Sequence, residues 1–114
     1  MDTIKSSSDI SYLFEHGRRI KAPGLNFIVA RTKEQHDRTG RVAFIAGKKN
    51  GNAVWRNRAK RRMRSICSDL GGPFIGLDVV FLARNTVNDI PYAELLDNAR
   101  HALSKSELFE LDVR

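Results

Sequence analysis

The alternation of apolar and polar residues predicts a helix at the start of the chain and strands after it. Ile10, Leu13 and Phe14 follow at helical spacing, serines before them can cap a helix, and Gly17 offers a stop. This pattern predicts a short helix over roughly 7 to 16. The simplest interpretation of the three apolar residues is that all of them face the core.

The next segments have the period of strands. Residues 25 to 31 place Leu25, Phe27 and Val29 on one face, which has the stronger claim to the core. The other face, with Ile28, is expected to be only partly buried. Residues 41 to 46 form a second strand, plausibly its hairpin partner across the polar loop 33–40, which holds His36. A further short strand is possible over 18–22.

The second half of the chain repeats the change from helix to strand. Residues 53 to 70 carry an apolar stripe at helical spacing, and Asn52 is a suitable N-cap. The apolar run in 77–84 predicts a strand buried on both faces, and a stripe beginning at Tyr92 predicts a helix to about 104. This order fits a two-layer α/β domain on a small mixed sheet. General chirality predicts a right-handed strand–helix–strand crossover.

Length and composition indicate one soluble domain over residues 1–114, with 1–5 and 105–114 expected to be frayed. The N-terminus has no apolar run of the signal-peptide kind, and no apolar stretch reaches the ~18 residues of a membrane span. A single cysteine, Cys67, excludes an internal disulfide. We therefore expect a cytoplasmic protein with no membrane partner.

Charge changes the picture, because it is concentrated in one segment. The chain has a formal net charge of +7, and residues 48–64 alone supply eight cations and no acid, so the remaining 97 residues sum to −1. In a helix over 53–70 the apolar stripe packs on the domain, and the cations occupy the other faces, with Arg62 at the edge of the stripe. Uncompensated repulsion between them indicates a polyanionic partner.

Four classes of partner compete for this segment. A membrane surface or a calmodulin-like groove needs a broad free apolar face, whereas this stripe is committed to the core. A nuclear-localisation signal does not explain Asn50, Asn52 and Asn57 among the cations. Nucleic acid explains both residue types, because Arg and Lys bind phosphate and Asn binds phosphate, sugar or base edges. A ribosome-type RNA-binding protein and a DNA-binding module both remain open at this point.

The sequence contains no specific catalytic constellation and no metal-ligand spacing. His16, His36 and His101 fall in different elements, and Cys67 lies beside the core stripe of its helix. No phosphate-binding loop or dinucleotide fingerprint is present. If the protein takes part in catalysis, another component is expected to break the bond.

The order of residues in the basic segment resembles the signature of the bacterial ribonuclease P protein family. That pattern is Lys-Lys, two residues, Asn-Ala-Val, one residue, Arg-Asn-Arg, one residue, Lys-Arg, and Arg three later. The chain matches it at every position, in 48–49, 52–54, 56–58, 60–61 and at Arg64. Residues 9–17, 78–84 and 92–103 also resemble family elements. The resemblance implies an αβββαβα two-layer sandwich, similar to ribosomal-protein S5 domain 2, with a left-handed crossover at the basic helix.

The resemblance also implies a function. Family members bind a large catalytic RNA, and the complex removes the 5′ leader of precursor tRNA by endonucleolytic cleavage. The hydrolysis is expected on the RNA with Mg²⁺ held mainly by the RNA, so no protein catalytic residue, no protein-bound metal and no protein partner is expected.

Two groups of site residues follow from matching the family position by position. Arg62 is added to the first as a cation of the same helix, and Arg18 to the second as a cation that guides leader phosphates. The RNA-binding group is Lys48, Lys49, Asn52, Arg56, Asn57, Arg58, Lys60, Arg61, Arg62 and Arg64. The group expected to line a cleft for the single-stranded leader is Ile10, Phe14, Arg18 and Ile28. Ile10 and Ile28 stand where the family has aromatic residues, so stacking on the leader is expected to be weaker here. Arg19 is a further candidate for guiding leader phosphates.

Overall fold

A computed structural model gives the structure of residues 3–4, 6–32 and 40–109. The polar loop expected over 33–40 lies outside the described residues except for Gly40, and so does His36. Within the described part of the chain, no helix combines the length and apolarity that a membrane span requires.

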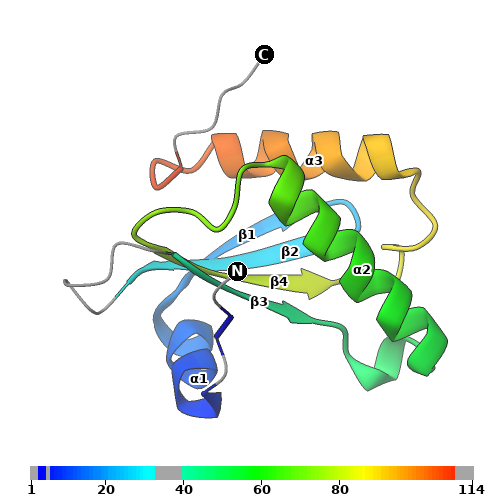
Figure 1. Ribbon diagram of the computed structural model, residues 1–114, viewed down its shortest axis with the longest axis horizontal. Coiled ribbons are helices and arrows are strands. Elements are labelled where there is room, and N and C mark those ends of the chain that lie inside the picture. The colour runs from blue at the N-terminus through cyan, green and yellow to red at the C-terminus, as the bar shows by residue number, and fades with distance from the viewer. Residues whose placement is uncertain (1–2, 5, 33–39, 110–114) are drawn as a thin grey trace.

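The elements occur in the order helix, three strands, two helices, strand and helix (Figure 1). They are α1 (Ser7–His16), β1 (Arg18–Ala22), β2 (Leu25–Arg31), β3 (Arg41–Ile45), the 3-10 turn η1 (Lys48–Asn50), α2 (Ala53–Asp69), β4 (Leu77–Ala83) and α3 (Tyr92–Ser104). These bounds agree with the sequence prediction to within one residue, and the short strand suggested over 18–22 is confirmed as β1. The αβββαβα order is confirmed.

The four strands form one mixed sheet in the order β1-β2-β4-β3. β4 is antiparallel to β2, with Phe27 opposite Phe81, and parallel to β3, with Phe44 opposite Phe81. The expectation that β3 is the hairpin partner of β2 is therefore wrong, because β4 lies between them. The hairpin partner of β2 is β1. β4 is the most apolar strand, and the central position buries it on both faces.

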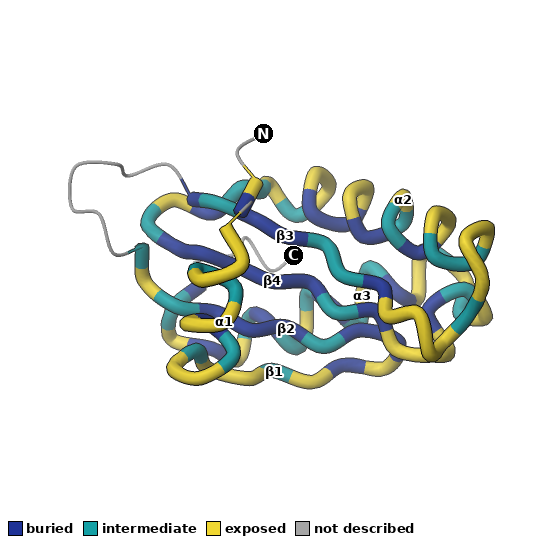
Figure 2. The backbone as a smooth tube through the Cα atoms, turned by 90° about the horizontal axis from the view of Figure 1, so that it is seen from below, coloured by how far each residue is buried: buried dark blue, intermediate teal, exposed yellow. Residues whose placement is uncertain are grey.

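The connection from β3 through α2 to β4 joins neighbouring parallel strands and crosses left-handedly, as Figures 1 and 2 together show. The right-handed default is wrong for this chain. General chirality describes how a twisted strand usually packs its crossover helix, and it takes no account of the packing partners that a particular helix needs. Here α2 lies beside α3 on the same face of the sheet.

Helices cover the two faces of the sheet unequally. On one face α2 and α3 enclose the larger core, where Leu25, Phe27 and Val29 are buried as expected and the Phe27 and Phe81 rings meet edge to face with centroids 5.0 Å apart. On the other face α1 stands alone (Figure 2) over a smaller cluster that contains Leu13 and Ile28. The expectation that Ile28 is only partly buried is wrong, because α1 covers it completely.

An ion-pair network ties α1 to the sheet. The Arg41 guanidinium donates from Nε and Nη2 to both carboxylate oxygens of Asp78, at 3.1 and 2.7 Å, and from Nη1 to Asp9 Oδ2 of α1 at 3.1 Å. The hydrogen bond with Asp78 is the main cause that raises the pKa of Arg41 above its ordinary value. Asp78 is 4% exposed, so this bidentate pair neutralises a carboxylate that the central strand buries.

Both ends of the described chain are attached to the core more firmly than the frayed ends expected from the sequence. Thr3 forms a parallel bridge with Val42, and Ile4 donates its backbone N–H to the Val42 carbonyl at 2.8 Å. Phe109 is buried and meets the Phe74 ring edge to face at 5.1 Å. Residues 1–2, 5 and 110–114 lie outside the described residues.

We expect Asp78→Asn to lower the free energy of unfolding by about 3 kcal/mol, because it leaves the Arg41 guanidinium without its buried counter-charge. Asp9→Asn is the matched control, since Asp9 binds the same guanidinium from a more exposed position and is expected to cost less than about 1 kcal/mol. Urea titrations of both variants with an unchanged m-value give the comparison. Equal losses in the two variants would contradict the central role of Asp78.

Candidate nucleic-acid interface

The basic helix α2 is anchored by one apolar face. Ala59, Met63, Ile66 and Cys67 of this face are all fully buried in the larger core. Burial raises the pKa of the Cys67 thiol to about 11, so the side chain is a protonated apolar group and not a nucleophile at neutral pH. Because the stripe is fixed in the core, the rotation of α2 is fixed, and with it the face of the helix from which each other side chain projects.

The start of α2 is held by a cap and by a close contact. Asn52 Oδ1 accepts a hydrogen bond from the Trp55 backbone N–H at 2.9 Å, which confirms Asn52 as the N-cap. A Cβ at Gly51 would stand 2.6 Å from the Trp55 ring, so only glycine lets the chain pass this side chain without a shift. From the loop side, Asn88 Nδ2 donates to the Trp55 carbonyl at 3.1 Å.

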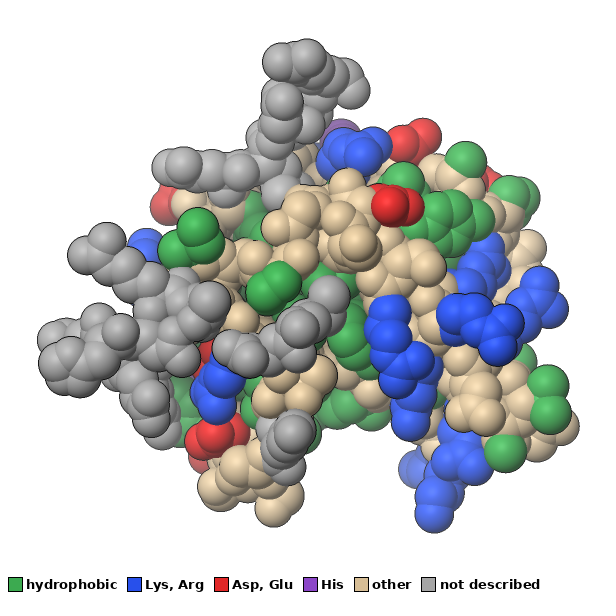
Figure 3. All heavy atoms as spheres, in the orientation of Figure 1, with side chains coloured by type: hydrophobic (Ala, Val, Ile, Leu, Met, Phe, Trp, Pro, Cys, Tyr) green, Lys and Arg blue, Asp and Glu red, His purple; other side chains and the backbone are tan. Residues whose placement is uncertain are grey.

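The cations form one surface along α2 and η1, which we call the α2 basic surface (Figure 3). Arg58, Arg61 and Arg64 are exposed, and the Arg64 guanidinium carbon lies 5.9 Å from the centre of the Phe44 ring. Two asparagines belong to the same surface. Of the remaining members, Lys48, Lys49, Asn52 and Asn57 are exposed, and Arg56 and Lys60 are half-buried. The structure therefore brings nine of the ten residues of the predicted RNA-binding group to this surface.

Arg62 is the exception, because the protein itself uses its guanidinium. Nη1 donates to the Val87 carbonyl at 2.8 Å, and Nη2 donates to the Ile90 carbonyl at 2.6 Å. Burial, and after it the charge of Arg58, lowers the pKa of Arg62 from its ordinary value. The side chain joins α2 to the segment before α3, and its guanidinium carbon lies 6.0 Å from the centre of the Tyr92 ring.

Tyr92 gives α2 and α3 a second connection, at the other end of the basic helix. Its hydroxyl donates to Asp69 Oδ2 at 2.6 Å, and burial followed by this hydrogen bond raises the pKa of Tyr92 to about 12. Asp69 is the first acidic residue after the cations in the sequence. Asp69, the last residue of α2, is thus engaged by a hydrogen bond from α3.

A second candidate surface lies where α1 meets the sheet. Ile10 and Phe14 of α1 and Ile45 and Leu82 of the sheet are partly buried around the small core; together with Arg19 we call them the α1–sheet surface. Ile28, predicted to line the leader cleft, lies beneath this surface with no exposed area. Ile10 and Phe14 are half-buried, because they pack against the small core with part of their surface left open, whereas Leu13 is fully buried.

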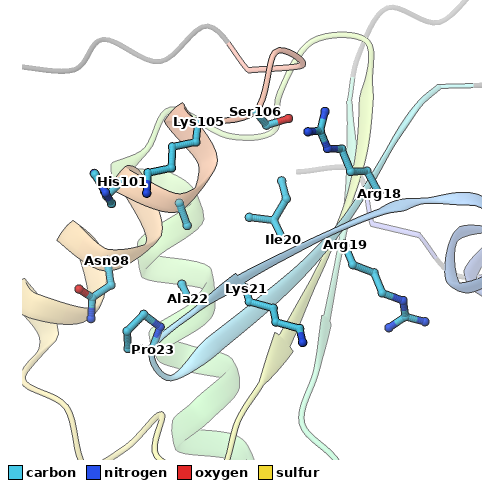
Figure 4. Close-up of a pocket in the computed structure, with 11 residues that line it drawn as sticks. Arg18, Arg19, Ile20, Lys21, Ala22, Pro23, Asn98, His101, Lys105 and Ser106 are labelled. Carbon is cyan, nitrogen blue, oxygen red and sulfur yellow. The ribbon is translucent and has the colours of Figure 1, made fainter.

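Arg18 lies on the other side of the sheet from the rest of the predicted cleft group. It pairs with Val29, which faces α3, whereas Arg19 pairs with Ile28, which faces α1. Figure 4 shows the two arginine side chains pointing to opposite sides of β1. Arg19 is the neighbour of Phe14, with its guanidinium carbon 5.7 Å from the ring centre and Nη2 donating to the Phe14 carbonyl at 3.2 Å.

The sequence contained a signal for this correction. Alternation along a strand over 18–22 places residues 18 and 20 on one face and residues 19 and 21 on the other. Gly17 supports the same geometry, because a Cβ there would stand 2.4 Å from Ile28 Cγ2, where the end of α1 turns down onto β2. Ile45 and Leu82 were not predicted for this surface, since their position depends on the strand order.

Metal ligands do not gather at either surface. Over the described residues, no group of three or more His, Cys, Asp or Glu side chains is close enough to hold a metal ion. Asp9 of α1 and Asp78 of β4 are both bound by Arg41. The described side chains thus provide no cluster that fits a Mg²⁺ ion by itself.

Comparison with known proteins gives consistent matches along the chain. The family model described as Ribonuclease P matches residues 1–107. The Ribonuclease P protein component of Streptococcus pyogenes serotype M5 (strain Manfredo) is 33% identical over 107 residues, covering 94% of this chain and 87% of the relative. The protein of the same name from Streptococcus mutans serotype c is 33% identical over 108 residues, with the same coverage.

Solved structures match the fold. The RNase P protein of Staphylococcus aureus superposes with a TM-score of 0.81 at 22% identity, covering 96% of this chain and 99% of that one. The RNase P protein from Thermotoga maritima gives a TM-score of 0.78 at 18% identity, covering 94% and 99%. These likenesses confirm the two-layer αβββαβα fold.

We expect Arg62→Ala to lower the free energy of unfolding by about 1–3 kcal/mol, because it removes the donors of two backbone carbonyls in a partly buried contact. Arg61→Ala removes the neighbouring exposed cation and is expected to change stability by less than about 0.5 kcal/mol. Thermal unfolding of both variants measures the difference. An unaltered melting temperature for Arg62→Ala would show that this guanidinium does not hold the two elements together.

Proposed function

The chain belongs to the ribonuclease P protein family, and on that premise we propose that it serves as the protein component of a ribonuclease P that matures the 5′ end of tRNA. The observation that supports this best is the α2 basic surface. Its nine residues stand at positions of the family signature, and the fold gathers them on one surface along η1 and the anchored helix α2.

We assign the α2 basic surface to the RNA subunit. Exposed arginines such as Arg58, Arg61 and Arg64 can make bidentate contacts with phosphate, and Asn57 between them can donate to or accept from sugar and base edges. Docking would also relieve the repulsion between cations that face no acid of their own helix. Binding of this kind weakens steeply as salt increases.

In this proposal, the chemistry takes place on the RNA subunit. Mg²⁺ bound mainly by that RNA activates water and stabilises the leaving oxygen. In this proposal the residues of this chain bind and orient the RNAs and take no part in the proton transfers of the reaction. No protein partner is needed for this role.

We assign the α1–sheet surface to the single-stranded leader of precursor tRNA. Phe14 offers a ring for a base to stack on, Ile10, Ile45 and Leu82 offer apolar contact, and Arg19 offers a cation beside the ring. Ile28 supports these residues from beneath, and Arg18 belongs to a different surface. Arg19 therefore takes the place that Arg18 was predicted to have.

Reconstitution tests the function directly. We expect the purified protein and its cognate RNA together to cleave the leader from precursor tRNA at moderate Mg²⁺ concentration, where neither component does so alone. The measurement is single-turnover cleavage of 5′-labelled precursor tRNA. An RNA subunit whose rate the protein does not raise would rule out the proposed role.

Two variants within the same assay separate RNA contact from folding. Arg61→Ala is expected to weaken binding to the RNA subunit and to reduce the dependence of log Kd on log salt, by about 0.7–0.9 for each phosphate that the protein no longer neutralises. Arg62→Ala, measured where it is folded, is expected to bind with little change, because its guanidinium is already engaged. The reverse ranking would show that Arg62 contacts RNA and Arg61 does not.

Phe14→Ala is expected to reduce discrimination between precursor and mature tRNA by about tenfold, the equivalent of stacking one base. The measurement is the ratio of the two Kd values for the assembled ribonucleoprotein. Phe14→Leu is the second variant, since it keeps apolar packing and loses the aromatic face. If only Phe14→Ala loses discrimination, and with it thermal stability, Phe14 is a core residue and not a stacking platform.

A further inference from the structure

A basic pocket lies between β1 and α3 (Figure 4), and Arg19 is the one residue that it shares with the surfaces assigned above. We call it the α3–β1 pocket. Arg18 stands at one side, Lys105 and His101 stand at the other, and Ile20 and Ala102 supply apolar walls. Asn98 and Ser106 add polar groups at the rim. The pocket combines cations from an edge strand and from the carboxyl end of a helix far along the chain.

The charge of this pocket is not balanced by any of the residues that the structure describes. No Asp or Glu occurs among the described residues that line it. Neither Arg18 nor Lys105 makes an ion pair with another described residue, and the nearby Asp97 is engaged by Arg100 at 3.3 Å. Lys105 compensates the negative end of the α3 dipole, but this does not account for Arg18 on the facing strand. A ligand with negative charge and hydrogen-bond acceptors fits the lining.

The dimensions indicate what kind of anion can enter. The cavity has a volume of about 490 Å³, in the range that encloses a small ligand. One nucleotide of a single-stranded RNA can fill such a space, whereas a base-paired helix is too wide to enter and can contact only the rim of the pocket. The apolar side chains of Ile20 and Ala102 suit the sugar or base beside a bound phosphate.

The position of the pocket connects it to the α1–sheet surface. β1 is an edge strand, so no further strand separates the two faces of the sheet there. Arg18 and Arg19 are consecutive and point to opposite faces, with Arg19 beside Phe14 and Arg18 in the pocket. A single-stranded RNA that stacks on Phe14 and continues around the β1 edge would therefore pass from Arg19 to Arg18.

From this geometry we propose that the α3–β1 pocket binds a backbone phosphate of the 5′ leader after the leader has left the α1–sheet surface. The proposal rests on the proposed function and adds a second subsite to it. Leaders long enough to round the β1 edge gain this contact, and shorter leaders do not. The affinity of the protein for precursor tRNA therefore depends on leader length through one phosphate contact, and it does not depend on the base sequence at that position.

The test compares two precursor tRNAs in the assembled ribonucleoprotein. One carries a leader of about 3 nucleotides and the other a leader of about 12, which brackets the span of many single-strand sites. The wild type is expected to bind the long-leader substrate more tightly. The double variant R18A/K105A is expected to lose about fivefold to tenfold in affinity for the long leader only, and its salt slope for that substrate is expected to fall by about 0.7.

The matched control is R31A/R100A, which removes the same net charge outside the pocket. Arg31 is the last residue of β2, Arg100 pairs with Asp97 on α3, and neither lines the pocket. This control is expected to bind both substrates like the wild type. An equal loss in the two double variants would show a general effect of charge and would overturn the proposal.

Other outcomes also decide. If R18A/K105A weakens binding of both substrates equally, or of the RNA subunit alone, the pocket serves a different RNA segment and the proposal is wrong. If the affinities of R18A/K105A for both substrates are unchanged, the proposal is wrong. Self-association of that variant would then show that the two cations keep the β1 edges of neighbouring molecules apart. Failure of the wild type to support cleavage at all would instead remove the proposed function, and with it the leader as the ligand of this pocket.

Discussion

The need to cover both faces of a four-stranded sheet governs this molecule. β4 carries apolar side chains on both faces, so both faces must be covered from solvent. The strand order also gives it a hydrogen-bonded neighbour at each edge, β2 and β3. α2 and α3 together satisfy one face, and α1 alone covers the other, with Arg41 neutralising the buried Asp78 at its margin. Because one helix is narrower than the sheet, a partly apolar area remains beside it.

The same constraint organises the cations. The buried stripe of α2 fixes the rotation of the helix, and the segment before α3 is tied to it through Arg62 and Asn88. The arginines left over therefore project from a rigid element and need little reordering when they meet phosphate. A run of cations in a mobile tail would carry the same charge and would lose more conformational entropy on binding.

Local patterns in the sequence predicted the element bounds, the buried central strand and the N-cap at Asn52, because each depends on neighbouring residues. The partner of β2, the burial of Ile28 and the role of Arg62 depend on contacts between residues far apart in the chain. Periodicity places Ile28 on a face of its strand but does not say which helix covers that face. It places Arg62 at the edge of a stripe but does not reveal the carbonyls of Val87 and Ile90.

The single tryptophan of the chain occupies an informative position. Trp55 is half-buried at the start of α2. Its ring packs against Gly51, its backbone carbonyl accepts a hydrogen bond from Asn88, and the exposed Arg58 follows three residues later. Its indole is therefore an intrinsic fluorophore at the margin of the α2 basic surface. Emission recorded at this one residue can follow docking of a polyanion in real time without any attached dye.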